Sequence, residues 1–100
     1  MQVQFLQPAQ YELDEAIDYC NAQVPHLGQA FLVEILASLD CICLWPDAWH
    51  SVSKNTRRCQ LKRFPYGIIY SKTDSAILVI AVAHLHRNPE YWQNLTLRTK

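Results

Sequence analysis

The fold is decided by residues 57–92, RRCQLKRFPYGIIYSKTDSAILVIAVAHLHRNPEYW, which predict three consecutive strands followed by a short polar and aromatic segment. Residues 58–64 alternate polar and apolar side chains, as a strand with one buried face does. Residues 66–71 are rich in β-branched and aromatic side chains, and the polar residues 72–75 predict a hairpin turn. Residues 76–83, AILVIAVA, are apolar throughout, so we expect a central strand with both faces covered.

The first helix is predicted from the spacing of apolar residues after Pro8. Residues 3–6 are a short extended segment that could pair with the later sheet, and proline suits the first turn of a helix. The inward face is then formed at helical spacing by Leu13, Ala16, Ile17 and Cys20. The opposite face is acidic, with Glu12, Asp14, Glu15 and Asp18. We interpret these acids as a solvated face favoured by the helix dipole rather than as a catalytic carboxylate pair.

A second, more buried helix is predicted to begin near Leu27, after a connection at residues 21–26. Its apolar stripe is formed by Phe31, Ile35, Leu39 and Ile42, widened by Leu32, Leu36 and Cys43. Pro46 ends the helix because proline cannot continue its hydrogen bonding. Residues 48–56 are interpreted as a connecting loop in which Trp49 covers an edge of the core.

These elements give the order β-α-α-β-β-β. We therefore expect an α+β fold in which a helical hairpin packs on a small, mainly antiparallel sheet. A chain of 100 residues is long enough for one modest core, so residues 1–100 are expected to form a single domain.

Charge and cysteine content argue against broad nonspecific binding to nucleic acid and against a metal site. Nine basic residues balance nine acidic ones, which weakens any argument for broad nonspecific binding to nucleic acid. A local basic cluster, interpreted as a solvated strand edge or a basic surface, contains Lys54, Arg57, Arg58, Lys62 and Arg63. The four cysteines form no CxxC pair and are expected to be reduced core thiols, without a metal site.

No cofactor or membrane association is expected. With only two glycines the chain has no glycine-rich phosphate loop or dinucleotide fingerprint. No apolar run approaches the roughly 20 residues that span a bilayer, and no secretory signal is recognised at the amino terminus. We therefore expect a cytoplasmic protein.

The assembled order and its motifs resemble the RelE/ParE superfamily of bacterial type II toxin-antitoxin toxins. The resemblance covers nearly the whole chain and rests above all on FPYGIIY at residues 64–70 and AHLHRNPEYW at residues 83–92. It implies a small cytoplasmic toxin that a cognate antitoxin protein wraps and neutralises. RelE-like members cut messenger RNA on the ribosome, whereas ParE-like members are linked to inhibition of DNA gyrase.

The ribonuclease alternative would need a base, a phosphate-binding cation and an acid. In that case the catalytic residues would be His84, His86, Arg87 and Tyr91, with Arg63 able to hold a phosphate. A hydrogen-bonded surface pair of histidines is the simpler interpretation of His84 and His86.

The neutral charge and the carboxy-terminal sequence favour the ParE-like branch, with DNA gyrase as the partner rather than the ribosome with its mRNA. In this interpretation the target-binding residues are Arg63, Arg87, Tyr91 and Trp92, because arginine and aromatic side chains are typical interface anchors. Packing of Tyr91 and Trp92 on the sheet is the alternative. A third possibility is a degenerate toxin that survives only as an antitoxin-binding protein.

An antitoxin is also expected on physical grounds. An all-apolar strand with only two helices to cover it leaves part of a groove or sheet face for a partner helix or strand.

Overall fold

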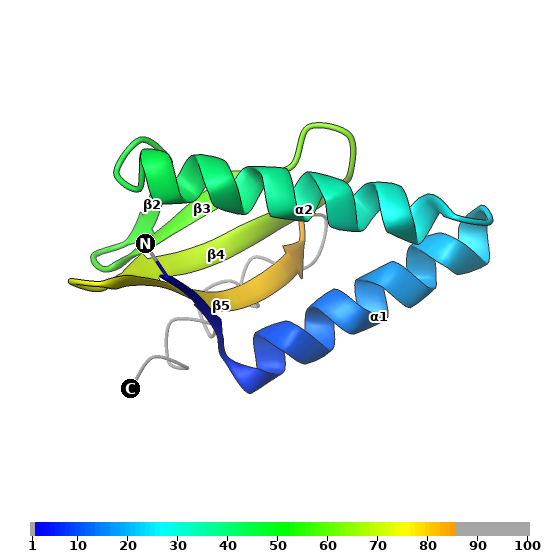
Figure 1. The fold of residues 1–100 in the computed structure, drawn as a ribbon, viewed down its shortest axis with the longest axis horizontal. Helices are drawn as coiled ribbons and strands as arrows, with labels where there is room; N and C mark the ends of the chain where they lie inside the picture. Colours follow the sequence, from blue (N-terminus) through cyan, green and yellow to red (C-terminus); the bar gives the residue numbers. More distant parts are fainter. Residues whose placement is uncertain (1, 86–100) are drawn as a thin grey trace.

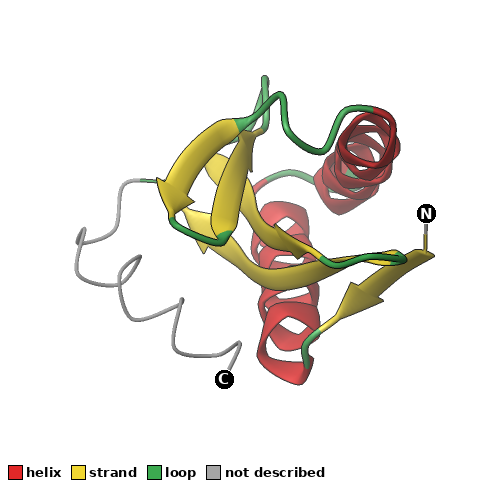
Figure 2. Cartoon of the chain, turned by 90° about the vertical axis from the view of Figure 1, so that its left-hand side faces the viewer, coloured by secondary structure: helices red, strands yellow, loops and turns green. Residues whose placement is uncertain are grey.

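The computed structural model describes residues 2–85, in which two helices pack on the same face of a five-stranded sheet (Figures 1 and 2). In chain order the elements are β1 (Gln2–Phe5), α1 (Gln7–Gln23), α2 (Leu27–Leu44), β2 (His50–Ser53), β3 (Thr56–Gln60), β4 (Tyr66–Lys72) and β5 (Ala76–His84). The predicted α+β class, with a helical hairpin on a mainly antiparallel sheet, is confirmed.

The sheet has the strand order β1-β5-β4-β3-β2, in which β1 is parallel to β5 and the other neighbours are antiparallel. The short amino-terminal strand therefore pairs with the later sheet as predicted, with Val3 opposite Ile77 and Phe5 opposite Val79. The polar turn before β5 is also confirmed, since the Thr73 amide donates to the Ala76 carbonyl at 2.8 Å. β5 thus lies between two paired strands along its first half.

The main core lies between the sheet and the helical hairpin. Ile77, Val79 and Val82 of β5 belong to the same buried cluster as Phe31 and Ile35 of α2. Burial of each such side chain stabilises the fold by about 1.5–3 kcal/mol. A second, smaller cluster of buried residues contains Ile69, Ile80, Ala81 and Ala83. β5 therefore contributes to two clusters, as its uninterrupted apolar sequence predicts.

β5 contains a β-bulge just beyond the last residue that pairs with β1. Ile69 lies opposite Ala81 and Tyr70 opposite Val79, so Ile80 is an extra residue in the ladder. The pairing with β1 reaches only to Val79.

Beyond that point the Val82 amide donates to Oε1 of Glu12 on α1 at 3.2 Å. The expectation that Glu12 belongs to a solvated acidic face is therefore wrong, because it is the acceptor for a strand amide. Asp14, Glu15 and Asp18 are exposed as predicted.

Two boundaries differ from the predicted ones. Residues 50–53, expected to be loop, form the edge strand β2, which has a register irregularity between Ser51 and Ser53 and only Val52 as an aliphatic residue. β3 ends at Gln60 instead of continuing to residue 64. The amides of Lys62 and Arg63 donate to Glu34 on α2 instead of to a neighbouring strand, so the chain leaves the sheet there.

The expectation of four core thiols is correct for two cysteines. Cys20 and Cys59 are buried, and burial raises the pKa of both, that of Cys59 to about 11. Cys41 is exposed on α2, and Cys43 is intermediate. None of the four cysteines, all of which lie within residues 2–85, forms a disulfide bond. The prediction is wrong for Cys41, because it lies on an exposed flank of α2 outside the buried stripe of that helix.

α2 is apolar on more than its inward face. By length and composition it is one helix among the described residues that could cross a membrane, with a mean hydropathy of 1.8. The sequence prediction of no apolar run of this length missed this helix, because Glu34 and Asp40 interrupt its apolar residues. Its buried residues are Gly28, Phe31, Ile35, Leu39 and Ile42, which pack in the domain interior.

Candidate functional site

One end of the sheet brings together two of the predicted site residues, Arg63 and His84. Arg63 lies in the connection between β3 and β4, and His84 is the last residue of β5. His84 pairs with Tyr66, and the Leu85 amide donates to the Pro65 carbonyl at 2.8 Å. The β3–β4 connection therefore packs beside the end of β5.

Arg63 is held by an ion pair with α2. Its Nε lies 3.1 Å from Oε1 of Glu34, and the side chains of Arg63 and Glu34 are 66% and 12% exposed. The guanidinium carbon also lies 5.9 Å from the centre of the Phe64 ring. The guanidinium group is thus positioned but still open to solvent, which suits a residue that contacts another molecule.

Glu34 fixes this connection electrostatically. Partial burial of the carboxylate acts to raise its pKa, but the hydrogen bonds from Arg63 and Lys62 and the charge of Arg63 outweigh it. The net result is a pKa below the usual value for glutamate. Glu34 is therefore ionised in the folded protein at neutral pH and accepts three hydrogen bonds from residues 62 and 63.

His84 packs against an aromatic residue of the core. Its ring centroid lies 5.0 Å from that of Tyr66, in an edge-on arrangement with an interplanar angle of 74°. Tyr66 packs in the same way on Phe31 at 5.0 Å. The imidazole thus continues an aromatic series that begins on α2.

The other predicted site residues lie outside the part of the chain that the structure describes. They are His86, Arg87, Tyr91 and Trp92. Their roles in catalysis or target binding stay predictions.

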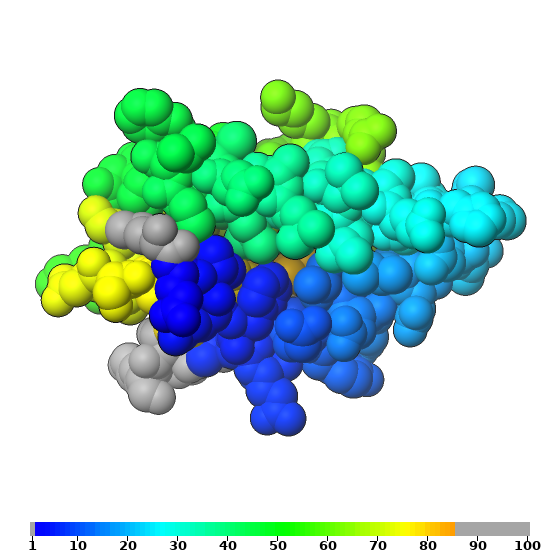
Figure 3. Space-filling model, in the orientation of Figure 1, coloured from blue at the N-terminus to red at the C-terminus, as the bar shows by residue number. Residues whose placement is uncertain are grey.

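A second surface, which the sequence interpretation missed, is the outer face of α2. Val33, Leu36, Leu44 and the following Trp45 are between 54% and 70% exposed. Residues 33, 36, 37, 40, 41 and 44 share one face at helical spacing, opposite the buried residues. We call these six residues and Trp45 the α2 outer face. In Figure 3, α2 crosses the visible side of the molecule above α1.

Leu36 had been predicted to widen the inward stripe, and its exposure overturns that assignment. The signal in the sequence was the second apolar series, which begins at Val33 and is offset by about half a turn from the series that begins at Phe31.

A helical hairpin on one face of a mixed five-stranded sheet defines the class of a small two-layer α+β protein. Residues 3–89 match the family model described as ParE toxin of type II toxin-antitoxin system, parDE. The chain therefore belongs to the ParE toxin family of type II toxin-antitoxin systems.

A search of the solved structures supports the fold. The chain is similar to a structure described as "Chromosomal ParDE TA system from P. aeruginosa", with a TM-score of 0.74 over 86% of this chain and 97% of that chain. The sequence identity is 14%, so this likeness shows the fold alone. A search of curated protein sequences finds no match.

The Glu34 network predicts a pH-dependent stability difference. Since the folded-state pKa of Glu34 is lowered, its stabilisation is present above the unfolded-state pKa of about 4.3 and is lost as the pH falls through the folded-state value. At pH 7 we expect Glu34→Gln to lower the free energy of unfolding by about 1 kcal/mol, because Arg63 is well solvated. Urea unfolding from pH 7 down to pH 3 should show this difference closing.

Asp40→Asn is the matched control, since Asp40 is an exposed acid on the same helix. We expect it to change stability little at any of these pH values. A difference between wild type and Glu34→Gln that is the same at pH 3 and pH 7 would show that the ionised carboxylate is not what holds Arg63.

Proposed function

We propose that this chain acts as a single-domain, cytoplasmic toxin that inhibits growth by binding DNA gyrase and is neutralised by a cognate antitoxin. The observation that carries the proposal is the match of residues 3–89 to the ParE toxin family. ParE-like toxins are the branch linked to gyrase. The balanced net charge also supports this branch over a ribosome-bound nuclease.

The proposed antitoxin site is the α2 outer face. Its residues recur at the i, i+3, i+4 and i+7 spacing that a partner helix can match. Val33, Leu36 and Leu44 present aliphatic surface whose burial supplies favourable free energy, and Trp45 is of the residue type that most often anchors an interface. An amphipathic helix of the antitoxin is therefore the proposed occupant.

The proposed gyrase-binding residues are Arg63, Arg87, Tyr91 and Trp92. Arg63 is the one within the described residues, and its exposed guanidinium group supports a contact role. It is tied to Glu34, which directly follows Val33 of the α2 outer face. An antitoxin helix on this face would therefore lie next to Arg63, and neutralisation would follow from blocking access to it.

The antitoxin site is tested by placing a charge on the α2 outer face. Leu36→Glu should weaken binding of the cognate antitoxin at least tenfold, because a carboxylate buried without a partner costs more than the lost apolar contact provides. Isothermal titration calorimetry with the full chain measures this. Tyr19→Glu on α1, an exposed aromatic residue outside the α2 outer face, is the control.

Cys41 provides an independent readout, since it is the exposed cysteine on this face. Antitoxin binding should protect it from maleimide. Unchanged affinity for Leu36→Glu, together with full reactivity of Cys41 in the complex, would place the antitoxin elsewhere.

The target is tested by expressing the chain without its antitoxin and assaying the purified protein. We expect growth arrest, inhibition of gyrase supercoiling, and no new cleavage of translated messages by primer extension. Arg63→Ala should reduce gyrase inhibition, whereas Glu34→Gln, which retains the arginine, should reduce it much less.

Message cleavage that His86→Ala or Arg87→Ala abolishes would instead support the RelE-type ribonuclease. Harmless expression of the chain alone would contradict both toxin activities and leave only a degenerate antitoxin-binding protein.

A further inference from the structure

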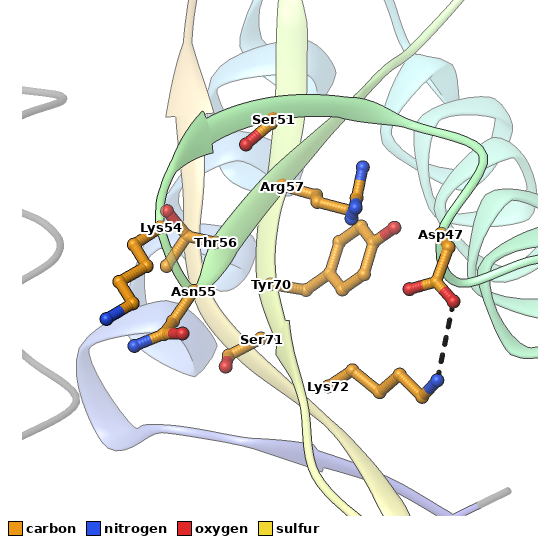
Figure 4. A pocket seen from close by; sticks show the side chains of 9 residues that line it. All are labelled: Asp47, Ser51, Lys54, Asn55, Thr56, Arg57, Tyr70, Ser71 and Lys72. Atoms are coloured by element: carbon orange, nitrogen blue, oxygen red, sulfur yellow. Dashed lines mark hydrogen bonds and ion pairs between the residues drawn. The ribbon is translucent and has the colours of Figure 1, made fainter.

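A polar pocket lies near the edge of the sheet that is formed by β2, whereas β1 forms the other edge. Its walls are the β2–β3 hairpin, the end of β4 and the chain that follows α2 (Figure 4). Its volume is about 420 Å³, within the range of roughly 300–1,000 Å³ that small-molecule sites occupy. Arg57 and Tyr70 lie close together in it, with Lys54 and Asn55 on one side and Lys72 and Asp47 on the other.

The pocket is cationic although the whole chain is neutral. Three cations, Lys54, Arg57 and Lys72, line it with a single carboxylate, that of Asp47. Nζ of Lys72 lies 3.5 Å from Oδ2 of Asp47, and both side chains are well exposed, so this ion pair is weak. The pocket therefore carries a formal excess of two positive charges.

Arg57 is fixed at the inner side of the pocket, and within residues 2–85 most of its guanidinium donors have no hydrogen-bond acceptor. Its Nη1 donates to the Trp49 carbonyl at 2.7 Å, which uses one of the five N–H groups of a guanidinium. The neighbouring Tyr70 ring is 1% exposed, and its hydroxyl donates to the Pro46 carbonyl at 2.5 Å. The position of the guanidinium is therefore set before any ligand arrives, which lowers the entropic cost of binding.

Lys54 has no role in holding the fold. Within residues 2–85 its ammonium group makes no hydrogen bond or ion pair, and it lies in the turn between β2 and β3. In Figure 4 the Lys54 side chain extends from this turn at the rim of the pocket, on the side away from Lys72. An exposed lysine side chain can turn towards an anion bound in the pocket, where its charge adds to those of Arg57 and Lys72.

We propose that this pocket binds a phosphate group, with the guanidinium of Arg57 donating to two phosphate oxygens and with Lys54 and Lys72 supplying charge. Arginine is suited to this because its planar fork matches the geometry of phosphate oxygens. The group could belong to a phosphorylated small molecule or to a nucleic acid backbone.

The first test is a titration of the isotope-labelled full chain with inorganic phosphate and pyrophosphate, followed by ¹H–¹⁵N correlation spectra. We expect saturable shifts of the amides of Asn55, Arg57 and Lys72, with pyrophosphate binding more tightly because it carries more charge. Chloride at matched ionic strength should produce no saturable shift at these positions. Absence of a saturable response to both probes would overturn the proposal.

Charge variants test whether pyrophosphate affinity rises and falls with the positive charge of the pocket. Lys54→Gln should weaken pyrophosphate binding by about three- to tenfold, and Asp47→Asn should strengthen it by about the same factor. Lys62→Gln, an exposed lysine outside the pocket, should leave the affinity unchanged. If Lys54 and Asp47 only stabilised the fold, the two substitutions would not change pyrophosphate affinity in opposite directions. Equal affinities for all four proteins would contradict the site.

Two further ligands distinguish the source of the phosphate. Adenosine diphosphate supplies terminal phosphate, whereas a short single-stranded DNA without terminal phosphates supplies only backbone phosphates. If the nucleotide binds more tightly and Lys54→Gln weakens its binding, the pocket is a small-molecule site. If the oligonucleotide binds more tightly and Lys54→Gln weakens its binding, the pocket contacts a nucleic acid backbone. Binding of either that Lys54→Gln leaves unchanged would count against this pocket.

Discussion

The structure depends on the burial of β5. Its first half is paired on one edge with β1 and on the other with β4, and its residues belong to two buried clusters. Ile77 and Val79 face the helical hairpin, and Ile80 and Ala81 are as fully buried in the second cluster. A strand this apolar cannot remain at a solvated surface. The hairpin of α1 and α2 and the pairing with β1 are the consequences of covering it.

The same requirement leaves α2 with two different faces. Phe31 and Ile35 are buried against the sheet, whereas Val33, Leu36 and Leu44 lie on the other side of the helix and are exposed. An exposed face with several large apolar side chains is the kind of surface that partners bind, which is why we propose it as the antitoxin site. Membership of the ParE toxin family implies an antitoxin partner for the chain. Glu34, between the two faces, connects this surface to Arg63.

Features with a local cause could be predicted from the sequence, and features with a distant cause could not. Helical spacing identified both helices, and the apolar sequence of residues 76–83 identified the buried strand. The early end of β3 was missed because its cause, Glu34, lies 28 residues before Lys62. β2 was missed because a four-residue edge strand with one aliphatic side chain has no clear period. The basic cluster was visible, but the pocket also needs Asp47, Tyr70 and Lys72 from other elements.

Hydrogen exchange of the backbone amides of the full chain tests the central position of β5 most directly. If the burial of β5 holds the fold together, the hydrogen-bonded amides of Val79 and its neighbours in β5 should exchange only through global unfolding, while β2 at the sheet edge opens locally and exchanges much faster. Exchange of the β5 amides as fast as those of β2, under conditions where the chain remains folded, would contradict the account.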